Sequence, residues 1–285
     1  MIFHVVEHTL LDSIKLLPFL FVTYLIMEYI EHKAGNKTQY MIKKSGKMGP
    51  FIGGLLGIVP QCGFSAAASN LYAGRIITMG TLLAVFLSTS DEMLPILISE
   101  QVAFTVIIKI LAVKALIGIA AGFTIDLFLR KKTDKEEHLR IDHICDHEHC
   151  HCEEGKIAVS ALRHTIQIFV FIILITFVLN ILIETIGEEA LAGFLSGMPI
   201  LGPIVAGIVG LIPNCASSVI ITQLYLQGVL SAGSMMAGLL VGAGVGVLVL
   251  FRVNDRIKEN IQITALLYIV GVIAGIIIET AGLAF

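Results

Sequence analysis

The sequence predicts an all-α polytopic membrane protein with two inverted-topology repeats, whose broken or re-entrant helices meet at the membrane midplane. Three observations lead to this prediction. Of the 285 residues, 56% are hydrophobic and only 14% are charged, whereas soluble domains carry about 25% charged residues. Several apolar stretches exceed the roughly 18 residues that a membrane-spanning helix needs. The third observation is that the second half of the chain repeats the motifs of the first.

The repeated motifs keep their order and their spacing. Residues 53–62 have the sequence GGLLGIVPQC and residues 206–215 have AGIVGLIPNC, which sets an offset of 153 residues (Cys62 to Cys215). The same offset relates Asp126 to Glu279. We therefore divide the chain into a first membrane repeat (residues 1–129), a cytoplasmic His/Cys-rich linker (130–163) and a second, inverted membrane repeat (164–285).

Basic residues indicate the orientation, because Lys and Arg collect in cytoplasmic loops. The loop at 31–48 holds five lysines, whereas its counterpart at 185–201 holds two glutamates and no basic residue. The loop near residue 100 has no basic residue, while its counterpart at 252–258 has three. We expect a multi-pass protein of the plasma membrane, with both termini outside and the linker in the cytoplasm. Inverted repeats of this kind are typical of secondary transporters.

Each repeat contains a break that we interpret as the tip of a re-entrant hairpin. Residues 49–60 are too few for a span of roughly 20 residues, so we expect the chain to turn at Gln61-Cys62 and return. One helix then crosses at about 76–98. The second repeat is expected to turn at Asn214-Cys215 and to cross at about 229–251. Three short tilted helices per repeat are the alternative, because tilt and local thinning of the bilayer adjust the length of a span.

The tips supply candidate substrate ligands. Proline frees a backbone carbonyl, amide side chains add oxygen and nitrogen, cysteines add soft sulfur, and serines follow on the returning helices. Small buried Cys and Ser residues also allow close helix packing, which is the alternative. The candidate substrate-binding residues at the two tips are Pro60, Gln61, Cys62, Ser65, Pro213, Asn214, Cys215, Ser217 and Ser218.

Charged residues near or within the apolar segments form a second group of candidates. Asp91 and Glu92 lie in the outer part of the first crossing helix, or they begin the outer loop and are solvated. Four acidic residues near helix ends are candidates for a proton or ion relay, with helix-end pairing or interfacial anchoring as the alternative: Glu28, Glu184, Asp126 and Glu279. Lys109 and Lys114 lie within an apolar segment, where they would snorkel, pair with a carboxylate or attract an anion.

The linker carries a dense run of metal-binding side chains. Thiolate and imidazole groups suit zinc, copper, nickel and similar ions. Their spacing is irregular, which favours a metal-collecting or sensing tract over a folded site, and a disordered charged linker is the alternative. The candidate metal ligands are His143, Cys145, His147, His149, Cys150, His151 and Cys152.

The paired Gly-x-x-Gly-x-x-Pro-x-Cys motifs and the His/Cys-rich central loop resemble the ten-helix heavy-metal exporter family. Members of that family are described as arsenic efflux proteins or manganese transporters. The resemblance covers nearly the whole chain and implies export of a metal or metalloid, without assigning a role to any residue. A total of ten helices implies that each hairpin arm is counted as a helix.

Two arguments about the substrate disagree. Returning helices that begin at the tips direct their positive ends to the midplane, which favours an anion. Free carbonyls and sulfurs at the same tips favour a cation or a thiophilic metalloid. We expect a secondary transporter that exports a heavy metal or metalloid, such as manganese or an arsenic species, by proton-driven alternating access.

The alternatives are an anion (oxyanion or carboxylate) carrier that uses the same tips, and a membrane-embedded metal sensor or scaffold. The sequence contains no GxxxxGK[ST] motif for binding ATP, and no nucleophile–base pair supports an enzyme. No basic patch indicates nucleic acid as a partner. We expect the lipid bilayer and the metal or metalloid substrate to be the partners, with a homodimer as a candidate assembly. No cofactor is expected beyond transition metal bound by the linker.

Overall fold

The computed structural model describes residues 17–18, 21–22, 24–25, 48–59, 62–90, 93–130, 157–186, 201–283 and 285. Within these ranges the regular structure is helical and no strand occurs, so the all-α prediction is confirmed there. Among the described residues, four stretches are long and apolar enough to cross a membrane: Met79–Ser99, Phe104–Phe128, Ala232–Val253 and Ile257–Thr280.

Two sets of five helices, separated by α9 (Ile157–Ile186), make up most of the described structure. The first helix set consists of α3 (Gly49–Gly57), α4 (Cys62–Ala73), α5 (Met79–Ser88), α6 (Met93–Ser99) and α7 (Phe104–Arg130). The second helix set consists of α11 (Gly202–Gly210), α12 (Cys215–Leu226), α13 (Ala232–Val241), α14 (Val245–Val253) and α15 (Ile257–Thr280). Helices α11, α12 and α13 begin and end 153 residues after α3, α4 and α5, which is also the offset between the sequence motifs.

The structure divides each predicted crossing helix in two. The sequence predicts continuous helices at about 76–98 and about 229–251. Instead, α5 ends at Ser88, and Thr89 and Ser90 are not helical, and residues 242–244 separate α13 from α14. Both stretches are long and apolar enough to cross a membrane, as predicted, but each is interrupted rather than one continuous helix. Each set contains two breaks, one between its first two helices and one between its third and fourth.

Local chemistry explains why the crossing helices break at these positions. At the end of α5, the hydroxyls of Ser88 and Thr89 donate to the carbonyls of Ala84 and Val85, at 2.7 Å each. Such side-chain bonds compete with the main-chain bonds of a helix. In the second set, Gly244 has a φ of 54°, which an L side chain rarely adopts and glycine adopts readily.

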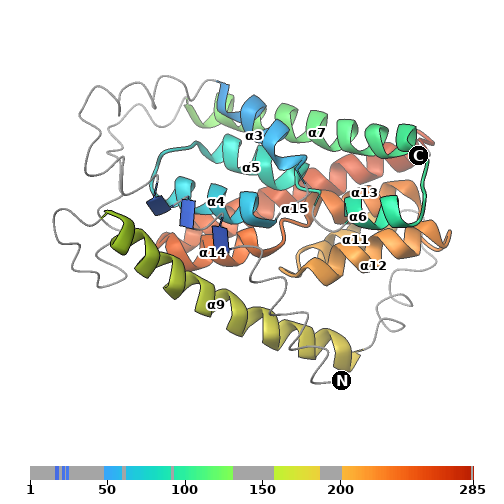
Figure 1. Cartoon of the computed structure of the whole chain (residues 1–285). Helices are drawn as coiled ribbons and strands as arrows, with labels where there is room; N and C mark the ends of the chain where they lie inside the picture. Colours follow the sequence, from blue (N-terminus) through green and yellow to red (C-terminus); the bar gives the residue numbers. More distant parts are fainter. Residues whose placement is uncertain are drawn as a thin grey trace.

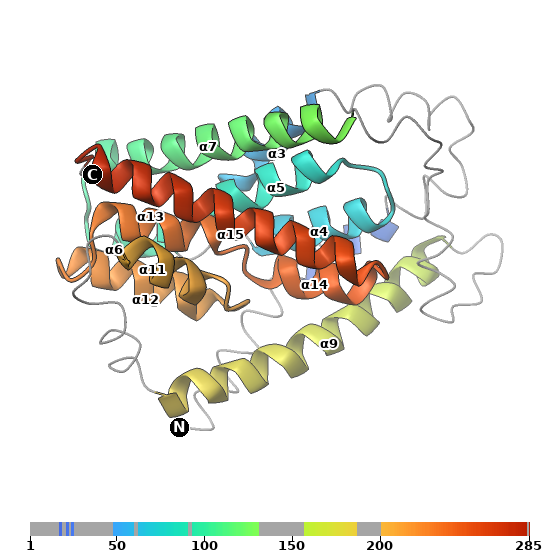
Figure 2. The same ribbon diagram turned by 180° about the vertical axis from the view of Figure 1, so that it is seen from behind.

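The first two helices of each set lie toward different ends of the molecule (Figures 1 and 2). Helices α3 and α4 lie toward one end, together with α14. Helices α11 and α12 lie toward the opposite end, together with α6. The longer helices α7 and α15 extend past both groups.

Helices α5 and α13 form the interior of the fold. Every residue in 80–88 and in 233–241 is buried. Helix α5 packs between α3 and α7, and α13 packs in the same way between α11 and α15. Close approach requires glycine, because a Cβ at Gly80 would overlap the carbonyl of Gly122, and one at Gly233 would overlap that of Gly275.

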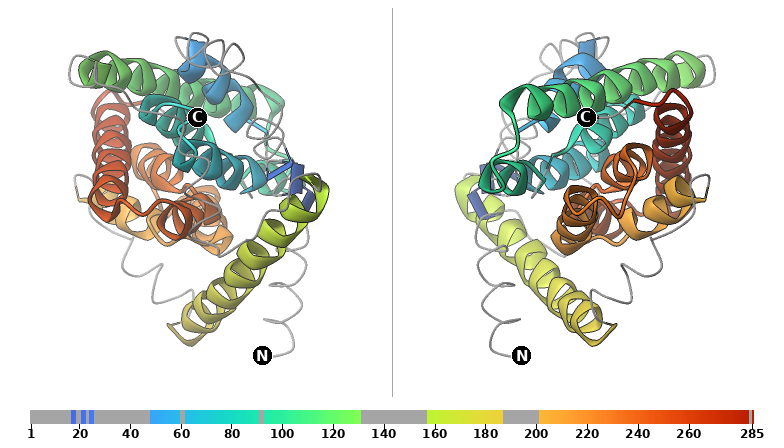
Figure 3. Two further views of the ribbon diagram at one scale, coloured as in Figure 1. Left: turned by 90° about the vertical axis from the view of Figure 1, so that its left-hand side faces the viewer. Right: turned by 90° about the vertical axis from the view of Figure 1, so that its right-hand side faces the viewer.

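The two sets contact each other through crossed pairs of helices. Helix α4 packs against α14, and α12 packs against α6. Helix α9 runs obliquely along one side of the molecule, where it contacts α14 (Figure 3). The long helices expose many large apolar side chains, as a lipid-facing surface requires. Those exposed on α7 and α15 include Leu116, Leu127, Phe128, Ile261, Ile269, Ile273 and Ile277.

Candidate substrate site at the helix breaks

Several predicted site residues lie outside the described residues, and their roles stay predictions. For Cys62 and Glu184 the structure describes the helical backbone but not the side chain. The predicted residues outside the described ranges are Pro60, Gln61, Asp91, Glu92, Glu28, His143, Cys145, His147, His149, Cys150, His151 and Cys152.

The two breaks of the first helix set contact each other. Helix α3 ends at Gly57, and the carbonyl of Ile58 just beyond it accepts a 2.6 Å hydrogen bond from the hydroxyl of Ser90. Ser90 lies between α5 and α6 and is buried. The residue that follows α3 is therefore held against the segment between α5 and α6.

At the tip of the second set, the predicted polar residues bond to their own backbone. Asn214 caps α12, and its Oδ1 accepts a 3.2 Å hydrogen bond from the amide of Ala216. The hydroxyl of Ser217 donates to the carbonyl of Asn214 at 2.8 Å, and that of Ser218 donates to the carbonyl of Cys215 at 2.8 Å. Asn214, Ser217 and Ser218 are buried, so these contacts fix the shape of the tip that follows Pro213.

Ser65 and Ser69 lie where the two helix sets pack most closely. Both serines are on α4 and are fully buried. The hydroxyl of Ser69 donates to the carbonyl of Gly246 on α14 at 2.7 Å. A Cβ added at Gly246 would meet the side chain of Ser65. Small side chains are needed at this contact, which is the packing alternative described for Ser65.

Lys114 joins the first break region to the second helix set. It lies on α7, and only 1% of its surface is exposed. Its ammonium donates to the carbonyl of Thr89 at 2.6 Å and to the carbonyl of Leu239 at 2.7 Å. Thr89 directly follows α5, and Leu239 lies in the last turn of α13. A buried positive charge therefore lies where the ends of α5 and α13 meet.

Asp126 and Glu279, two of the predicted relay residues, hold equivalent helix ends. Asp126 accepts from the amide of Gly80 at 2.9 Å and from the hydroxyl of Thr78 at 2.7 Å, at the start of α5. Glu279 accepts from the amide of Gly233 at 3.1 Å, at the start of α13. Carboxylates at helix N-termini are favoured by the helix dipole. These contacts agree with helix-end pairing, the alternative described for both residues.

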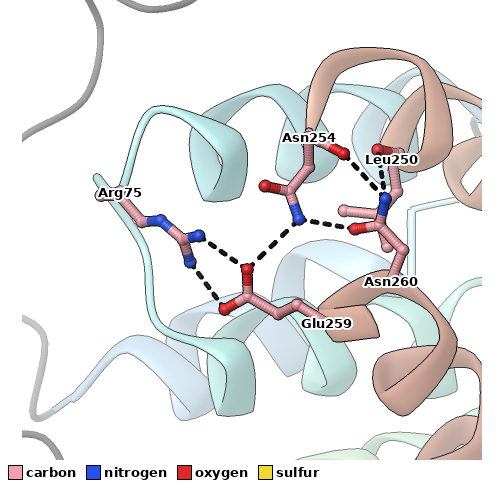
Figure 4. A network of polar contacts seen from close by, with 5 residues as sticks. All are labelled: Arg75, Leu250, Asn254, Glu259 and Asn260. Carbon is pink, nitrogen blue, oxygen red and sulfur yellow. Dashed lines mark hydrogen bonds and ion pairs between the residues drawn. The ribbon is translucent and has the colours of Figure 1, made fainter. Parts of the chain in front are cut away.

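Figure 4 shows a polar network that sequence reasoning missed. Arg75 follows α4, and its guanidinium donates to both carboxylate oxygens of Glu259 on α15, at 2.9 and 2.6 Å. Asn254 also donates to Glu259, and Asn260 donates to the carbonyls of Asn254 and Leu250. Burial opposes the charge on Arg75, but the interactions with Glu259 and Tyr72 together outweigh it and hold the pKa of the guanidinium above its usual value.

The comparison with protein families identifies the chain. Residues 5–188 match the family described as "Putative, 10TM heavy-metal exporter". The chain belongs to this heavy-metal exporter family. The resemblance stated from the paired motifs is thus confirmed. No curated protein and no solved structure matches the chain.

Membership of the heavy-metal exporter family makes the chain a multi-pass membrane protein, in agreement with its apolar helices. The family match ends at residue 188, before the second helix set. Beyond the match, the bounds of α11, α12 and α13 repeat those of α3, α4 and α5.

Across the described part of this chain, no group of three or more His, Cys, Asp or Glu side chains lies together. The polar groups gathered at the breaks are mainly hydroxyls, an amide and main-chain carbonyls. Oxygen ligands of this kind suit hard cations, and the thiol of Cys215, which is half-buried and in no disulfide, adds a soft donor.

Proposed function

We propose that this chain is a secondary active exporter of a heavy metal or metalloid, which works by proton-coupled alternating access through a site at the helix breaks. The observation that carries the proposal is the position of the breaks. They lie between α3 and α4, α5 and α6, α11 and α12, and α13 and α14, and side chains bond their main-chain carbonyls: Ser90 donates to Ile58 and Lys114 donates to Thr89. Non-helical backbone at membrane depth is tolerated where it lines a cavity or is buried in protein.

We propose that the two helix sets are inverted repeats and that α3–α4 and α11–α12 are re-entrant hairpins. Three kinds of observation support this proposal. The bounds of α3, α4 and α5 recur 153 residues later, and the two hairpins lie toward opposite ends of the molecule (Figures 1 and 2). The distribution of Lys and Arg among the loops also favours opposite sides of the membrane for equivalent loops. A rocking motion of one set against the other would then alternate access to the site.

The substrate ligands in this proposal come from both tips. They are the substrate-binding candidates at the two tips together with Asp91 and Glu92. Manganese would use the oxygen ligands, whereas an arsenic species or another thiophilic ion would use the sulfurs of Cys62 and Cys215. The carbonyls of Thr89 and Leu239 already hold an ammonium, and groups that hold an ammonium also favour a metal cation.

An anion carrier is the second candidate, and two observations favour it. Helices α4 and α12 begin at the tips, so their positive ends face the site. Lys114 also brings a buried ammonium. Against this candidate, the ammonium is already bound by two carbonyl oxygens, which would repel an anion. Metal or metalloid export is therefore the leading proposal.

The remaining parts of the proposal concern location and the linker. We place the protein in the plasma membrane, with both termini outside and the linker in the cytoplasm, where its His and Cys residues would collect metal for export. Deleting residues 142–154 should change the sensitivity to metal and leave transport intact. Complete loss of transport would contradict this accessory role.

Efflux from intact cells tests the proposed function. Cells that express the protein are loaded with manganese, zinc or arsenite, and the retained element is measured by ICP-MS. We expect faster loss of at least one of them than from vector-only cells, and we expect a protonophore to abolish the difference. Unchanged retention of all three would contradict metal or metalloid export.

A further inference from the structure

The same turn follows α4 in the first helix set and α12 in the second. The amide of Arg75 donates to the carbonyl of Tyr72 at 2.9 Å. Its equivalent in the second set, the amide of Gly228, donates to the carbonyl of Tyr225 at 3.0 Å. Both turn residues have a positive φ, 59° for Arg75 and 73° for Gly228. Glycine is the usual residue at such a helix end, because an L side chain adopts this conformation at a cost. The first set therefore has an arginine where the turn itself favours glycine.

The Arg75 side chain has a role that glycine cannot supply, because it binds across the two helix sets (Figure 4). Its guanidinium donates to both carboxylate oxygens of Glu259, in the first turn of α15. Asn254, just after α14, donates to the same carboxylate at 3.4 Å. The end of α4 is thus tied to the end of α14 and to the start of α15.

The equivalent positions in the other half of the repeat lack the charges for such a pair. Helix α7 begins 153 residues before α15, and the position that corresponds to Glu259 is Val106. Val106 packs against an apolar cluster that includes Leu97 of α6 and Leu224 of α12. Helices α6 and α12 lie at the opposite end of the molecule from α4 and α14 (Figures 1 and 2). The two ends are therefore joined differently at these positions, by an ion pair at one and by apolar packing at the other.

We propose that the pair of Arg75 and Glu259 is a latch that holds the cytoplasmic end of the transport pathway closed, and that it breaks each time the site opens to admit the cation. This proposal rests on the proposed function, because it uses the rocking of one helix set against the other. It also uses the orientation, in which the basic loop at 252–258, directly before Glu259, is cytoplasmic. It makes the two openings unequal, because the inner one breaks an ion pair and the outer one separates apolar surfaces.

An ion pair suits a contact that must open to water and close again. Both side chains are largely buried, so both charges lose most of their hydration while this end is closed. Their attraction compensates for that loss, and hydration in turn compensates for the lost attraction when the end opens. If one partner is removed, the remaining charge is buried and unpaired only in the closed form. The equilibrium should then shift toward the form that is open to the cytoplasm.

Three substitutions probe the latch. Arg75→Gly gives the first set the residue that the second set has at the same turn, so its effect comes from the lost side chain and not from the backbone. Glu259→Gln removes the charge of the partner and keeps its size. Arg75→Lys keeps the charge without the two-point geometry, so its effect should be intermediate. Lys258→Ala, at an exposed neighbour of Glu259, is the matched control.

Hydrogen–deuterium exchange of the full chain in proteoliposomes, followed by mass spectrometry, measures opening at each end. For each single variant that breaks the pair, we expect exchange at least about threefold faster than wild type in residues 66–77 and 246–260, because local opening sets the rate. Residues 93–107 and 219–230, at the opposite end, should exchange no faster. A protein that is merely destabilised would exchange faster at both ends. The double variant should exchange more slowly than either single variant, because it leaves no unpaired charge.

Uptake of Mn²⁺ or Zn²⁺ into inside-out membrane vesicles tests the role of the latch in export, because the added cation then meets the cytoplasmic face. We expect the half-saturating concentration to fall at least about threefold in Arg75→Gly and Glu259→Gln, since a larger fraction of the protein has its site open to that face. The maximal rate should not rise, because each cycle must also return through the closed form. Lys258→Ala should match the wild type in both assays.

The outcomes separate the latch from the proposed function. Exchange that becomes faster to the same extent at both ends, or at neither, would overturn the latch and leave metal export in place. Faster exchange at the latch end with an unchanged half-saturating concentration would overturn its role in admitting the cation. No cation uptake by the wild type would overturn the proposed function, and with it this role. If Arg75→Gly does not fold, exchange at wild-type rates in Glu259→Gln would still overturn the latch.

Discussion

Arg75 and Glu259 form a two-point ion pair that joins the end of α4 in the first helix set to the start of α15 in the second. The two bonds measure 2.9 and 2.6 Å, and the guanidinium also lies 5.0 Å from the ring centre of Tyr72. Only 7% of the Arg75 side chain and 18% of the Glu259 side chain are exposed. The ion pair ties together two sets that alternating access would require to move.

Removal of either partner should destabilise the protein. We expect Arg75→Ala or Glu259→Ala alone to lower the free energy of unfolding by about 2 to 3 kcal/mol, because each leaves a largely buried charge without its partner. Thermal unfolding in detergent measures the loss. Lys258→Ala, at an exposed neighbouring residue, is the control and should change stability by less than about 0.5 kcal/mol. The double variant should lose less than the sum of the single losses, whereas additive losses would show that the pair is not coupled.

The contacts of Asp126 lead to a second prediction. Asp126→Asn keeps an oxygen for the amide of Gly80, so we expect it to fold and to transport at close to the wild-type rate. Asp126→Ala removes that oxygen and should cost about 1 kcal/mol, the usual loss for a helix cap. Unfolding temperatures and flux of the two variants measure the difference. A folded Asp126→Asn protein that has lost proton coupling would instead support the relay predicted from the sequence.

The close contact of α11 with α13 leads to a third prediction. A Cβ at Gly210 would overlap the carbonyl of Gly238, which is backbone and cannot turn aside. We expect Gly210→Ala to lower the free energy of unfolding by about 1 to 3 kcal/mol. The control is Gly207→Ala on the same helix, where the nearest atoms belong to the side chains of Val272 and Tyr268. Equal losses in the two variants would contradict the proposed backbone contact.

The sequence predicted the helical class and the position of the first break in each helix set well. The offset of 153 residues, set by the motifs around Pro60 and Pro213, also relates the bounds of α3 to those of α11. Proline and glycine act locally on the backbone, so their effect can be inferred from the sequence alone.

The second break and the polar contacts were not predicted, for a physical reason. Gly242 and Gly244 were available as a sign of a break, but glycine is also common in packed membrane helices. The bond from Lys114 to Leu239 joins residues that are 125 positions apart, and the pair of Arg75 and Glu259 spans 184 positions. Partners at such distances are set by the packing of whole helices, which hydrophobic patterning does not specify.

The two cysteines at the tips give a fourth prediction, which concerns the substrate. If sulfur binds the substrate, Cys62→Ser combined with Cys215→Ser should lower arsenite or zinc flux at least about tenfold and leave manganese flux largely unchanged, because serine retains only an oxygen ligand. Flux into proteoliposomes measures both. Serine at Cys145, Cys150 and Cys152 in the linker is the matched control. Unchanged zinc and arsenite flux in the tip variant would exclude ligation by sulfur.

Flux through the purified protein in proteoliposomes, measured for manganese, zinc, arsenite and phosphate under an imposed pH gradient, tests the central claim most directly. We expect uptake of at least one of the first three, dependent on the gradient and reversed when the gradient is reversed, and no uptake of phosphate. Phosphate flux alone would support the anion carrier. No flux of any of the four would contradict the claim that this chain transports a metal or metalloid.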